Sequence, residues 1–193
     1  MDSAHRKTNL IITAIEIIDD LGYQGLTIHE LGKRQNISDA AIYKHFKDKN
    51  DLVKSVLDYY NDFFNKITQS IESENTSSIK AIEKFISEYL KLYMEHPHMA
   101  GILNSFDPFR HEKDLSKYIS DMFLRRVTYL KKLIQRGIDN NEFTRQVDAE
   151  SLAYVMMGTM MSVTLSWRIQ NYSFSLTDKI QLITAQIGNV LTS

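Results

Sequence analysis

Five basic side chains lie between residues 33 and 49, a stretch with only two acidic ones. The basic residues are Lys33, Arg34, Lys44, Lys47 and Lys49, and the acidic ones are Asp39 and Asp48. The stretch therefore carries a local net charge of +3, and its side chains can donate hydrogen bonds to the phosphates of a nucleic acid. The whole chain gives no such indication, because 23 Lys and Arg stand against 24 Asp and Glu.

Residue patterns for other kinds of chemistry are scarce in the 193-residue chain. Cysteine is absent, which excludes disulfide scaffolds, thiolate metal sites and a cysteine nucleophile. No phosphate-binding loop, zinc-protease motif or nucleophile elbow occurs. His96, His98 and His111 suggest a metal, but a His-x-His beside a proline is more typical of a helix end. We expect no metal, no cofactor and no enzymatic activity.

The elements that position the basic side chains are predicted to be helices. Apolar residues recur at helical spacing almost throughout, without a competing alternating pattern, and the two prolines, Pro97 and Pro108, lie close together near the middle. In the first helix the apolar face runs from Leu10 to Leu21. Gly22 follows, where a residue at positive φ commonly ends a helix. The sequence predicts an all-α protein.

Two short helices follow the first one. Thr27 and Glu30 form a capping box that opens a helix of about two turns, which Asn36 interrupts. A second short helix runs from Ala40 to Phe46. Three helices in this order, two of them short and joined by a tight turn, indicate a helix-turn-helix, whose second short helix enters the DNA major groove.

About a quarter of the chain resembles the TetR/AcrR family of bacterial one-component regulators. The matching residues are Ile15, Ile18, Leu21-Gly22-Tyr23, Leu26-Thr27-Ile28, Leu31, Ile37-Ser38, Ile42-Tyr43-Lys44-His45-Phe46 and Lys49-Asn50-Asp51-Leu52. The chain departs from the family pattern in two places. Leu31-Gly32 replaces the usual Ile-Ala, and Asn36 replaces a usual turn Gly, although Asn is the next-best residue at positive φ.

The resemblance implies a role for each position. Tyr43 and Lys49 are expected to bind DNA phosphates, and Thr27 to add a further backbone contact. The candidate base-reading residues are Ser38, Asp39, Ala40, Lys44 and His45.

Three of these base-reading positions allow a finer expectation. Lys44 could donate to guanine O6 and N7, and Ala40 could touch a thymine methyl. Asp39 has two open interpretations, because a carboxylate near phosphates is repelled. It either accepts from a cytosine N4 amine or completes the helix cap with Ser38.

The domain expectation is a DNA-binding domain over residues 1–48 and a larger domain over residues 49–193. The resemblance implies that the larger domain, a helical bundle in a chain of about nine helices, senses a small-molecule effector and dimerises. The methionine and aromatic residues that could line a pocket there are Met94, Met99, Phe106, Phe109, Met122, Phe123, Tyr154, Met157, Met161 and Trp167. Each of them taken singly is more typical of ordinary core, whereas the cluster as a whole indicates a pocket between helices.

The last two helices, over residues 148–170 and 177–192, are too apolar to remain exposed. Two from each subunit would make a four-helix homodimer interface, as the resemblance also implies. A two-fold symmetric dimer is expected to bind a palindromic double-stranded DNA operator.

These features predict a cytoplasmic regulator, because the beginning of the chain lacks a signal-peptide pattern and the longest uncharged run is too short to span a bilayer. The expected activity is repression of transcription. A small apolar or amphipathic molecule is expected to release the operator by shifting the helix over residues 52–71. The alternatives are a DNA-associated structural or adaptor protein that senses no ligand, and a helical-bundle enzyme.

Overall fold

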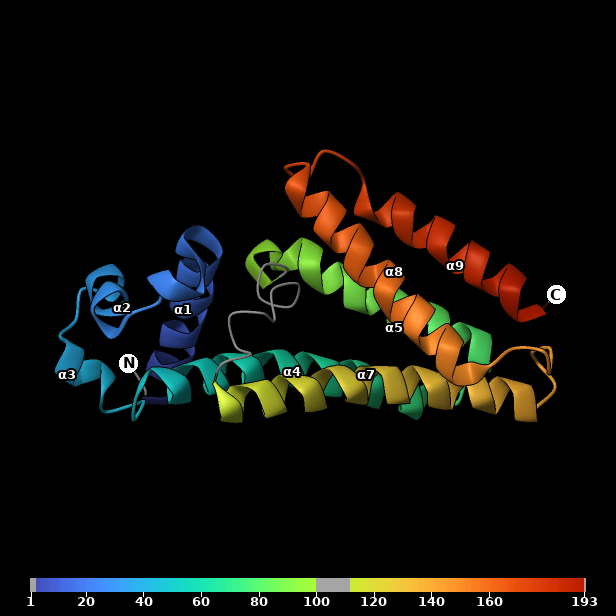
Figure 1. Cartoon of the computed structure of the whole chain (residues 1–193), viewed down its shortest axis with the longest axis horizontal. Helices are drawn as coiled ribbons and strands as arrows, with labels where there is room; N and C mark the ends of the chain where they lie inside the picture. The colour runs from blue at the N-terminus through green and yellow to red at the C-terminus, as the bar shows by residue number, and fades with distance from the viewer. Residues whose placement is uncertain (1–2, 100–111, 193) are drawn as a thin grey trace. The chain divides into compact units, whose positions relative to one another are not determined.

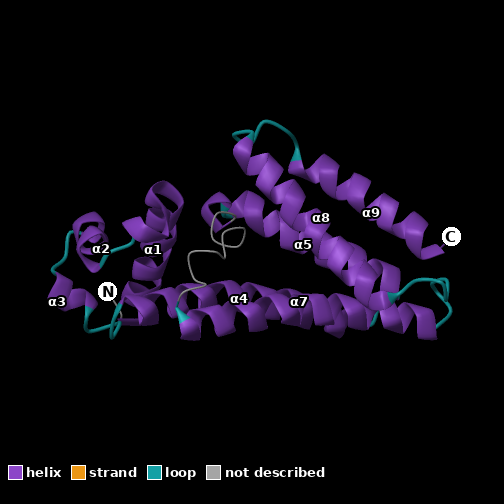
Figure 2. Cartoon of the chain, viewed as in Figure 1, coloured by secondary structure: helices purple, strands orange, loops and turns teal. Residues whose placement is uncertain are grey.

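The computed structural model describes residues 3–99 and 112–192, and over these ranges it contains helices and no strand (Figure 2). The predicted all-α fold is confirmed. The helices are α1 (Ser3–Gly25), α2 (Ile28–Gln35), α3 (Asp39–Ile42), α4 (Lys49–Glu74), α5 (Ser78–Glu95), α7 (Lys113–Asp139), α8 (Ala149–Ile169) and α9 (Leu176–Thr192).

The described residues form two compact units. The first unit holds residues 3–63 and 112–119, and the second unit holds residues 64–99 and 120–192. Helices α4 and α7 each contribute one part to the first unit and the other part to the second. The chain therefore offers two continuous helices that belong to both units.

The first unit builds its core from α1, α2 and α3, drawn in blue in Figure 1. Leu10, Leu31, Ile42 and Phe46 are completely or almost completely buried. Burying an apolar side chain of this size stabilises a fold by roughly 1.5–3 kcal/mol. Gly22 interrupts α1 with a φ of 71°, so the predicted helix end is confirmed in its backbone conformation.

The turn of the helix-turn-helix depends on one cap, one left-handed residue and one glycine. Thr27 Oγ1 accepts a hydrogen bond from the Glu30 amide at 3.0 Å, as the capping box predicts. Asn36 has φ 51° and ψ 47°, so it adopts the expected left-handed conformation. A Cβ atom on Gly32 would lie 2.8 Å from the carbonyl oxygen of Ile37, which shows that the turn approaches α2 too closely for a side chain there.

Two aspartates, Asp48 and Asp51, accept backbone hydrogen bonds at the beginning of α4. Asp48 Oδ1 accepts from the Asp51 amide at 2.9 Å, so Asp48 provides the N-terminal cap of this helix. Asp51 Oδ2 in turn accepts from the amide of Lys47, also at 2.9 Å. These bonds satisfy amide groups that no helical carbonyl can reach, and they fix where α4 begins.

An aromatic cluster fills the second unit between α4, α5 and α7. The ring of Phe64 meets the rings of Phe85 and Tyr129 edge-on, at centroid distances of 6.3 Å and 6.1 Å. Phe85 also stacks on Tyr89 at 5.6 Å. Such pairs add about 0.5–1.5 kcal/mol each beyond the area they bury.

Glu142, in the loop before α8, holds the first turn of α5. Its carboxylate accepts from the Ser78 amide at 2.7 Å and from the Ser78 hydroxyl at 3.2 Å. Arg136 joins the same cluster, because its Nε donates to Ser78 Oγ at 3.1 Å. A side chain 64 residues away therefore provides the N-terminal cap of α5.

Helix α5 packs on α8 and α9, and α8 packs on α9 (Figure 1). The outer faces of α8 and α9 carry several large apolar residues in contact with solvent. These residues are Tyr154, Val155, Leu165, Ile169, Leu182 and Val190. Single exposed apolar residues are ordinary, but a group on two adjacent helices indicates an interaction surface.

Candidate nucleic-acid interface and ligand groove

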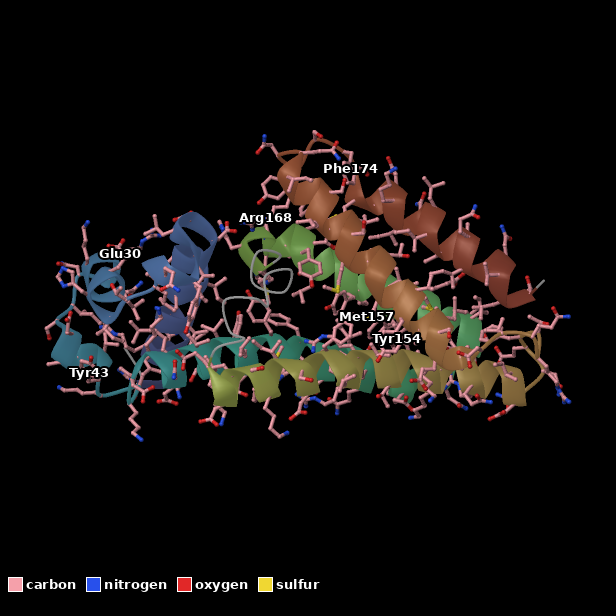
Figure 3. All side chains as sticks on the ribbon, in the orientation of Figure 1. Glu30, Tyr43, Tyr154, Met157, Arg168 and Phe174 are labelled. Carbon is pink, nitrogen blue, oxygen red and sulfur yellow. The ribbon has the colours of Figure 1, made fainter. Side chains whose placement is uncertain are left out.

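Helix α3 and the turn after it expose five of the predicted DNA-contacting side chains. Ser38 caps the helix by accepting from the Ala41 amide at 3.3 Å. The other four, Asp39, Ala40, Tyr43 and Lys44, are exposed, and Tyr43 is 54% accessible on this segment (Figure 3). The short helix thus presents hydroxyl, carboxylate, methyl and ammonium groups together.

Asp39 has a neighbour that the sequence did not indicate. Its Oδ1 lies 3.9 Å from Nδ1 of His29, the second residue of α2, and both side chains are largely exposed. The α3 cap itself comes from the Ser38 hydroxyl. A positively charged imidazole beside the Asp39 carboxylate would reduce the repulsion between that carboxylate and DNA phosphates. The interaction of a solvent-exposed pair at this distance is weak, however.

Thr27 caps α2, and His45 lies in the turn after α3. Because the Thr27 oxygen accepts from an amide, its hydroxyl hydrogen stays available to a phosphate oxygen. His45 is half-buried, with its ring centroid 6.4 Å from that of Phe46. The roles assigned to both residues remain predictions.

Lys49 occupies the first position of α4 and is bound to the protein itself. Its Nζ donates to the carbonyl oxygen of Tyr23 at 3.1 Å and lies 4.2 Å from the centroid of the Tyr23 ring. Burial lowers the pKa of Lys49, and the nearby Glu112 carboxylate partly opposes this. Lys49 therefore ties the end of α1 to the beginning of α4, while an ammonium group retains further donors for a phosphate.

Two of the five basic residues are neutralised by acids that precede the charged stretch. Arg34 donates to Asp20 at 2.7 Å and to Glu30 at 3.1 Å, and Lys33 lies 4.0 Å from Glu30. The charge of +3 counted over residues 33–49 does not include Asp20 and Glu30, which pair with Lys33 and Arg34. The positive charge on this part of the surface is therefore smaller than that count. Lys44 and Lys47 stay exposed.

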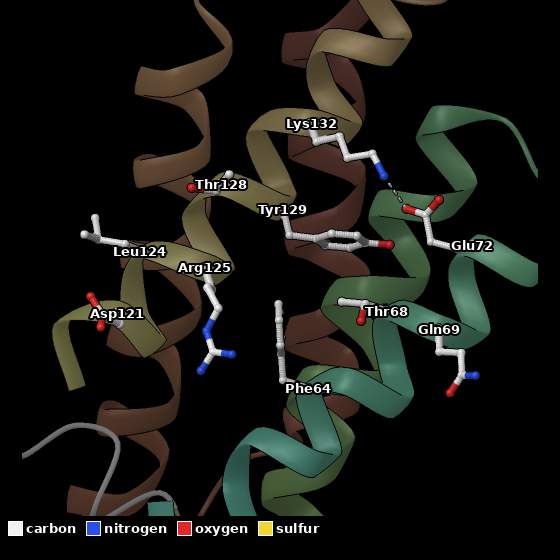
Figure 4. A pocket seen from close by; sticks show the side chains of 10 residues that line it. All are labelled: Phe64, Thr68, Gln69, Glu72, Asp121, Leu124, Arg125, Thr128, Tyr129 and Lys132. Carbon is white, nitrogen blue, oxygen red and sulfur yellow. Dashed lines mark hydrogen bonds and ion pairs between the residues drawn. The ribbon is translucent and has the colours of Figure 1, made fainter. Parts of the chain in front are cut away.

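The second unit contains an open groove of about 740 Å³ between α4 and α7 (Figure 4). It combines an apolar floor with charged side chains. Its lining residues are Phe64, Thr68, Gln69, Glu72, Asp121, Leu124, Arg125, Thr128, Tyr129 and Lys132. Volumes of this size are typical of small-molecule sites.

Charges in the groove are partly paired. Lys132 Nζ donates to Glu72 Oε1 at 3.1 Å, and this bond holds the pKa of Glu72 below its ordinary value. Burial raises the pKa of Tyr129, whose hydroxyl faces Glu72, so this phenol stays protonated and neutral (Figure 4). Arg125 is exposed on the same wall. The groove can accept an amphipathic molecule with an anionic part.

The ten predicted pocket residues do not coincide with the lining of this groove. Two of them, Phe106 and Phe109, lie outside the described residues. Four are buried, namely Met99, Met122, Met157 and Trp167. Met94, Phe123 and Met161 are partly buried, and Tyr154 is exposed on α8 (Figure 3). Their role in a pocket stays a prediction.

Some residues of the groove could have been found from the sequence. Thr68, Glu72, Thr128 and Lys132 repeat every four residues beside the apolar stripes of two helices. The two stripes are 60 residues apart in the chain, and the sequence does not show that they face each other in the fold. The groove therefore needed the structure.

A second groove, of about 320 Å³, runs along the outer face of α8 and α9. It is lined by Leu152, Val155, Thr159, Lys179, Leu182, Ile183, Gln186, Ile187 and Val190. Val155 and Leu182 are 60% and 58% exposed, although both are aliphatic. This face suits an apolar protein partner more than a polar ligand.

Comparison with known families decides the identity of the chain. Residues 10–56 match the family of bacterial regulatory proteins named tetR, and residues 58–187 match the C-terminal region of YsiA-like proteins. The chain belongs to the tetR family. The resemblance inferred from the helix-turn-helix residues is thereby confirmed, and so is the prediction of a DNA-binding transcriptional regulator.

Relatives of this tetR-family chain include two named regulators. The fatty acid metabolism regulator protein of Bacillus subtilis (strain 168) is 21% identical over 168 residues, which cover 86% of both chains. The biofilm operon icaADBC negative regulator IcaR of Staphylococcus aureus (strain Newman) is 29% identical over 84 residues, 44% of this chain and 45% of that protein.

Solved structures share the fold of this tetR-family chain. The fatty acid degradation regulator FadR from Bacillus halodurans aligns with a TM-score of 0.83 at 19% identity, covering 94% of each chain. FadR from Bacillus subtilis in complex with stearoyl-CoA aligns with a TM-score of 0.82 at 18% identity, covering 95% of this chain and 99% of that one.

Two negative findings apply to the described part of this tetR-family chain. None of its helices is both long and apolar enough to cross a lipid bilayer. Its His, Asp and Glu residues form no group of three or more that could hold a metal ion.

Proposed function

We propose that this tetR-family regulator represses transcription as a homodimer on a palindromic operator and that a long-chain acyl-CoA releases it. The observation that carries the effector class is the groove between α4 and α7, whose apolar floor and Arg125 suit a molecule that is apolar at one end and anionic at the other. The relatives support this class, because one is named for fatty acid metabolism and another was solved with stearoyl-CoA.

Residues 1–48 are proposed to bind DNA and residues 49–193 to bind the effector and dimerise. Thr27, Tyr43 and Lys49 contact phosphates in this proposal. Base edges are contacted by Ser38, Asp39, Ala40, Lys44 and His45. The exposure of α3 and of the turn after it supports these assignments, since side chains in a groove must reach beyond the backbone.

Helices α8 and α9 are proposed to form the dimer interface. Exposed Val155, Leu182 and Val190 line one groove across the two helices, and pairing two copies would remove these side chains from water. A self-complementary patch on two helices produces a two-fold dimer, which matches the symmetry of a palindromic operator.

The proposed coupling between effector and DNA runs through α4. Residues 49–63 of this helix belong to the first unit and residues 64–74 to the second, and the latter line the groove. Suppose that the protein has two states that differ in where α4 lies, and that the effector binds one state more tightly. The effector would then change the placement of Lys49, at the start of α4, and of the helix-turn-helix that precedes it in the chain. The protein acts by binding alone in this account and is not an enzyme.

A gel-shift experiment on DNA from upstream of the protein's own gene tests this function. The protein should shift a fragment that contains a palindrome, and added stearoyl-CoA should abolish the shift while stearoyl-CoA has no effect on an unrelated DNA-binding protein. A protein that shifts no palindromic fragment at low salt is not an operator-binding repressor. A shift that acyl-CoA leaves unchanged would indicate the adaptor that senses no ligand.

A further inference from the structure

Arg126, on α7, is a buried cation that lacks a full set of partners in the described part of the chain. The residue is 3% exposed, and its Nη1 donates to the carbonyl oxygen of Met122 at 2.7 Å. Its Nε has no hydrogen-bond partner, and no carboxylate among the described residues forms an ion pair with it. A neutral carbonyl is thus the hydrogen-bond acceptor for a group that carries a full charge.

Burying such a charge is costly. A guanidinium group loses its hydration when it enters the protein, and a single carbonyl bond returns only part of that free energy. The ring of Phe64, whose centroid lies 4.9 Å from Cζ of Arg126, offsets a further part through a cation–π contact. A buried charge without an ion pair among the described residues needs an explanation, and a bound ligand would supply one.

The surroundings of Arg126 indicate what that ligand is. Phe64 contacts the guanidinium and belongs to the aromatic cluster with Phe85 and Tyr129. Phe64 and Tyr129 also line the groove between α4 and α7. An apolar environment next to a single cation suits a hydrocarbon chain whose end carries an oxygen acceptor.

We propose that Arg126 binds the oxygen-bearing head of the acyl effector inside the second unit, an inference that rests on the function proposed above. Two ligand sources share this head: the carboxylate of a free fatty acid and the thioester carbonyl of an acyl-CoA. A guanidinium without a counter-charge gains more from a carboxylate than from a neutral carbonyl, because the hydrogen bonds are then assisted by charge on both partners.

Thermal unfolding of the ligand-free protein separates a ligand-binding role of Arg126 from a structural one. Arg126→Met removes the charge and roughly keeps the volume, so the melting temperature should stay unchanged or rise. A clear fall would show that the bonds to Met122 and Phe64 already repay the burial, and it would overturn the proposal. Should Arg126→Met not fold at all, Arg126→Lys keeps the charge, and its ligand affinity decides the question.

Calorimetric titration with stearate and with stearoyl-CoA tests binding directly. Arg126→Met should weaken the better ligand by about tenfold or more, the loss typical of a hydrogen bond to a charged group. Arg126→Lys should keep part of the affinity. Lys131→Met is the matched control, because it removes one charge from an exposed side chain of the same helix and should leave the affinity unchanged.

The outcomes distinguish this inference from the proposed function. If wild type and Arg126→Met bind stearate with equal affinity, and also bind stearoyl-CoA with equal affinity, the role of Arg126 is wrong and the effector class stands. If wild type binds neither ligand, the effector class itself is wrong. A larger loss for stearate than for stearoyl-CoA would assign the carboxylate as the head that Arg126 binds, and the reverse would assign the thioester.

Discussion

At the scale of single residues, the proposed DNA contacts separate into those that hold a phosphate and those that read a base. Tyr43 is a neutral phenol on an exposed turn, and Lys44 beside it is a charged donor. A phosphate contact is independent of sequence, whereas a donor to guanine is not. The two neighbours therefore should respond differently to substitution.

Tyr43→Phe should weaken binding to the operator and to its single-base variants by the same factor. Lys44→Ala should instead relax the preference at particular positions, by about 1–3 kcal/mol if Lys44 contacts a base well. Fluorescence anisotropy on a panel of single-base operator variants measures both. Exchanged outcomes would exchange the two roles.

Glu72 and Lys132 give the groove a pH dependence. The bond from Lys132 lowers the pKa of Glu72 from its ordinary 4.5, so Glu72 contributes stability above pH 4.5 that is lost as the pH falls through the lowered pKa. Lys132→Met should remove that contribution, less than about 1 kcal/mol because the pair is exposed. Thermal unfolding measured at pH values above and below 4.5 should show a loss of stability at acid pH in the wild type. The loss should be smaller in Lys132→Met.

At the scale of elements, the helix-turn-helix is specified by local signals that the sequence displays. Gly22, Thr27 and Asn36 each act within four residues of their own position, and each adopts the backbone or cap predicted for it. Asp48 acts equally locally, because it caps α4. Gly32 is similar, because its role is to let the turn before α3 approach α2.

Gly32→Ala should destabilise the protein by about 1–3 kcal/mol, since the new Cβ would overlap a backbone oxygen that cannot move freely. Operator affinity should fall with it. Gly188→Ala is the control, because its Cβ would meet Ile79 at an ordinary 4.0 Å, and it should stabilise α9 by up to about 1 kcal/mol. Chemical denaturation of both variants measures the difference. Equal stability of Gly32→Ala and wild type would show that the turn relaxes.

Contacts between distant elements could not be predicted in the same way. The bonds from Lys49 to Tyr23, from Arg34 to Asp20 and from Ser78 to Glu142 join residues 26, 14 and 64 positions apart. Local periodicity carries no information about such pairs. The burial of Arg126 could have been predicted from the sequence. Arg126 lies four residues from both Met122 and Leu130, on an otherwise apolar helix face.

At the scale of the whole molecule, the family followed from the first quarter of the chain and the all-α fold from helical spacing almost throughout it. Neither signal located the proposed effector groove. Four of the ten methionine and aromatic pocket candidates are buried, and burial does not decide their role, because composition does not tell a cavity wall from a packed interior. The last two helices are apolar in sequence, and in the structure they expose large apolar side chains on one face.

Val155→Asp and Leu182→Lys should each dissociate the proposed dimer. Both side chains are more than half exposed in the single chain, so the fold of the protomer should be unaffected. Burying an unpaired charge in the interface would cost several kcal/mol. Sedimentation analysis should then find monomers that no longer bind the operator. Dimers of unchanged stability would place the interface elsewhere.

The most direct test of the central claim is the affinity for stearoyl-CoA, measured by calorimetry with and without saturating operator DNA. If effector and operator favour different states of one protein, DNA must weaken effector binding by the same factor by which the effector weakens DNA binding. A factor of about 5–150 is typical of such coupling. Equal affinity for stearoyl-CoA in both conditions would contradict an effector-released repressor.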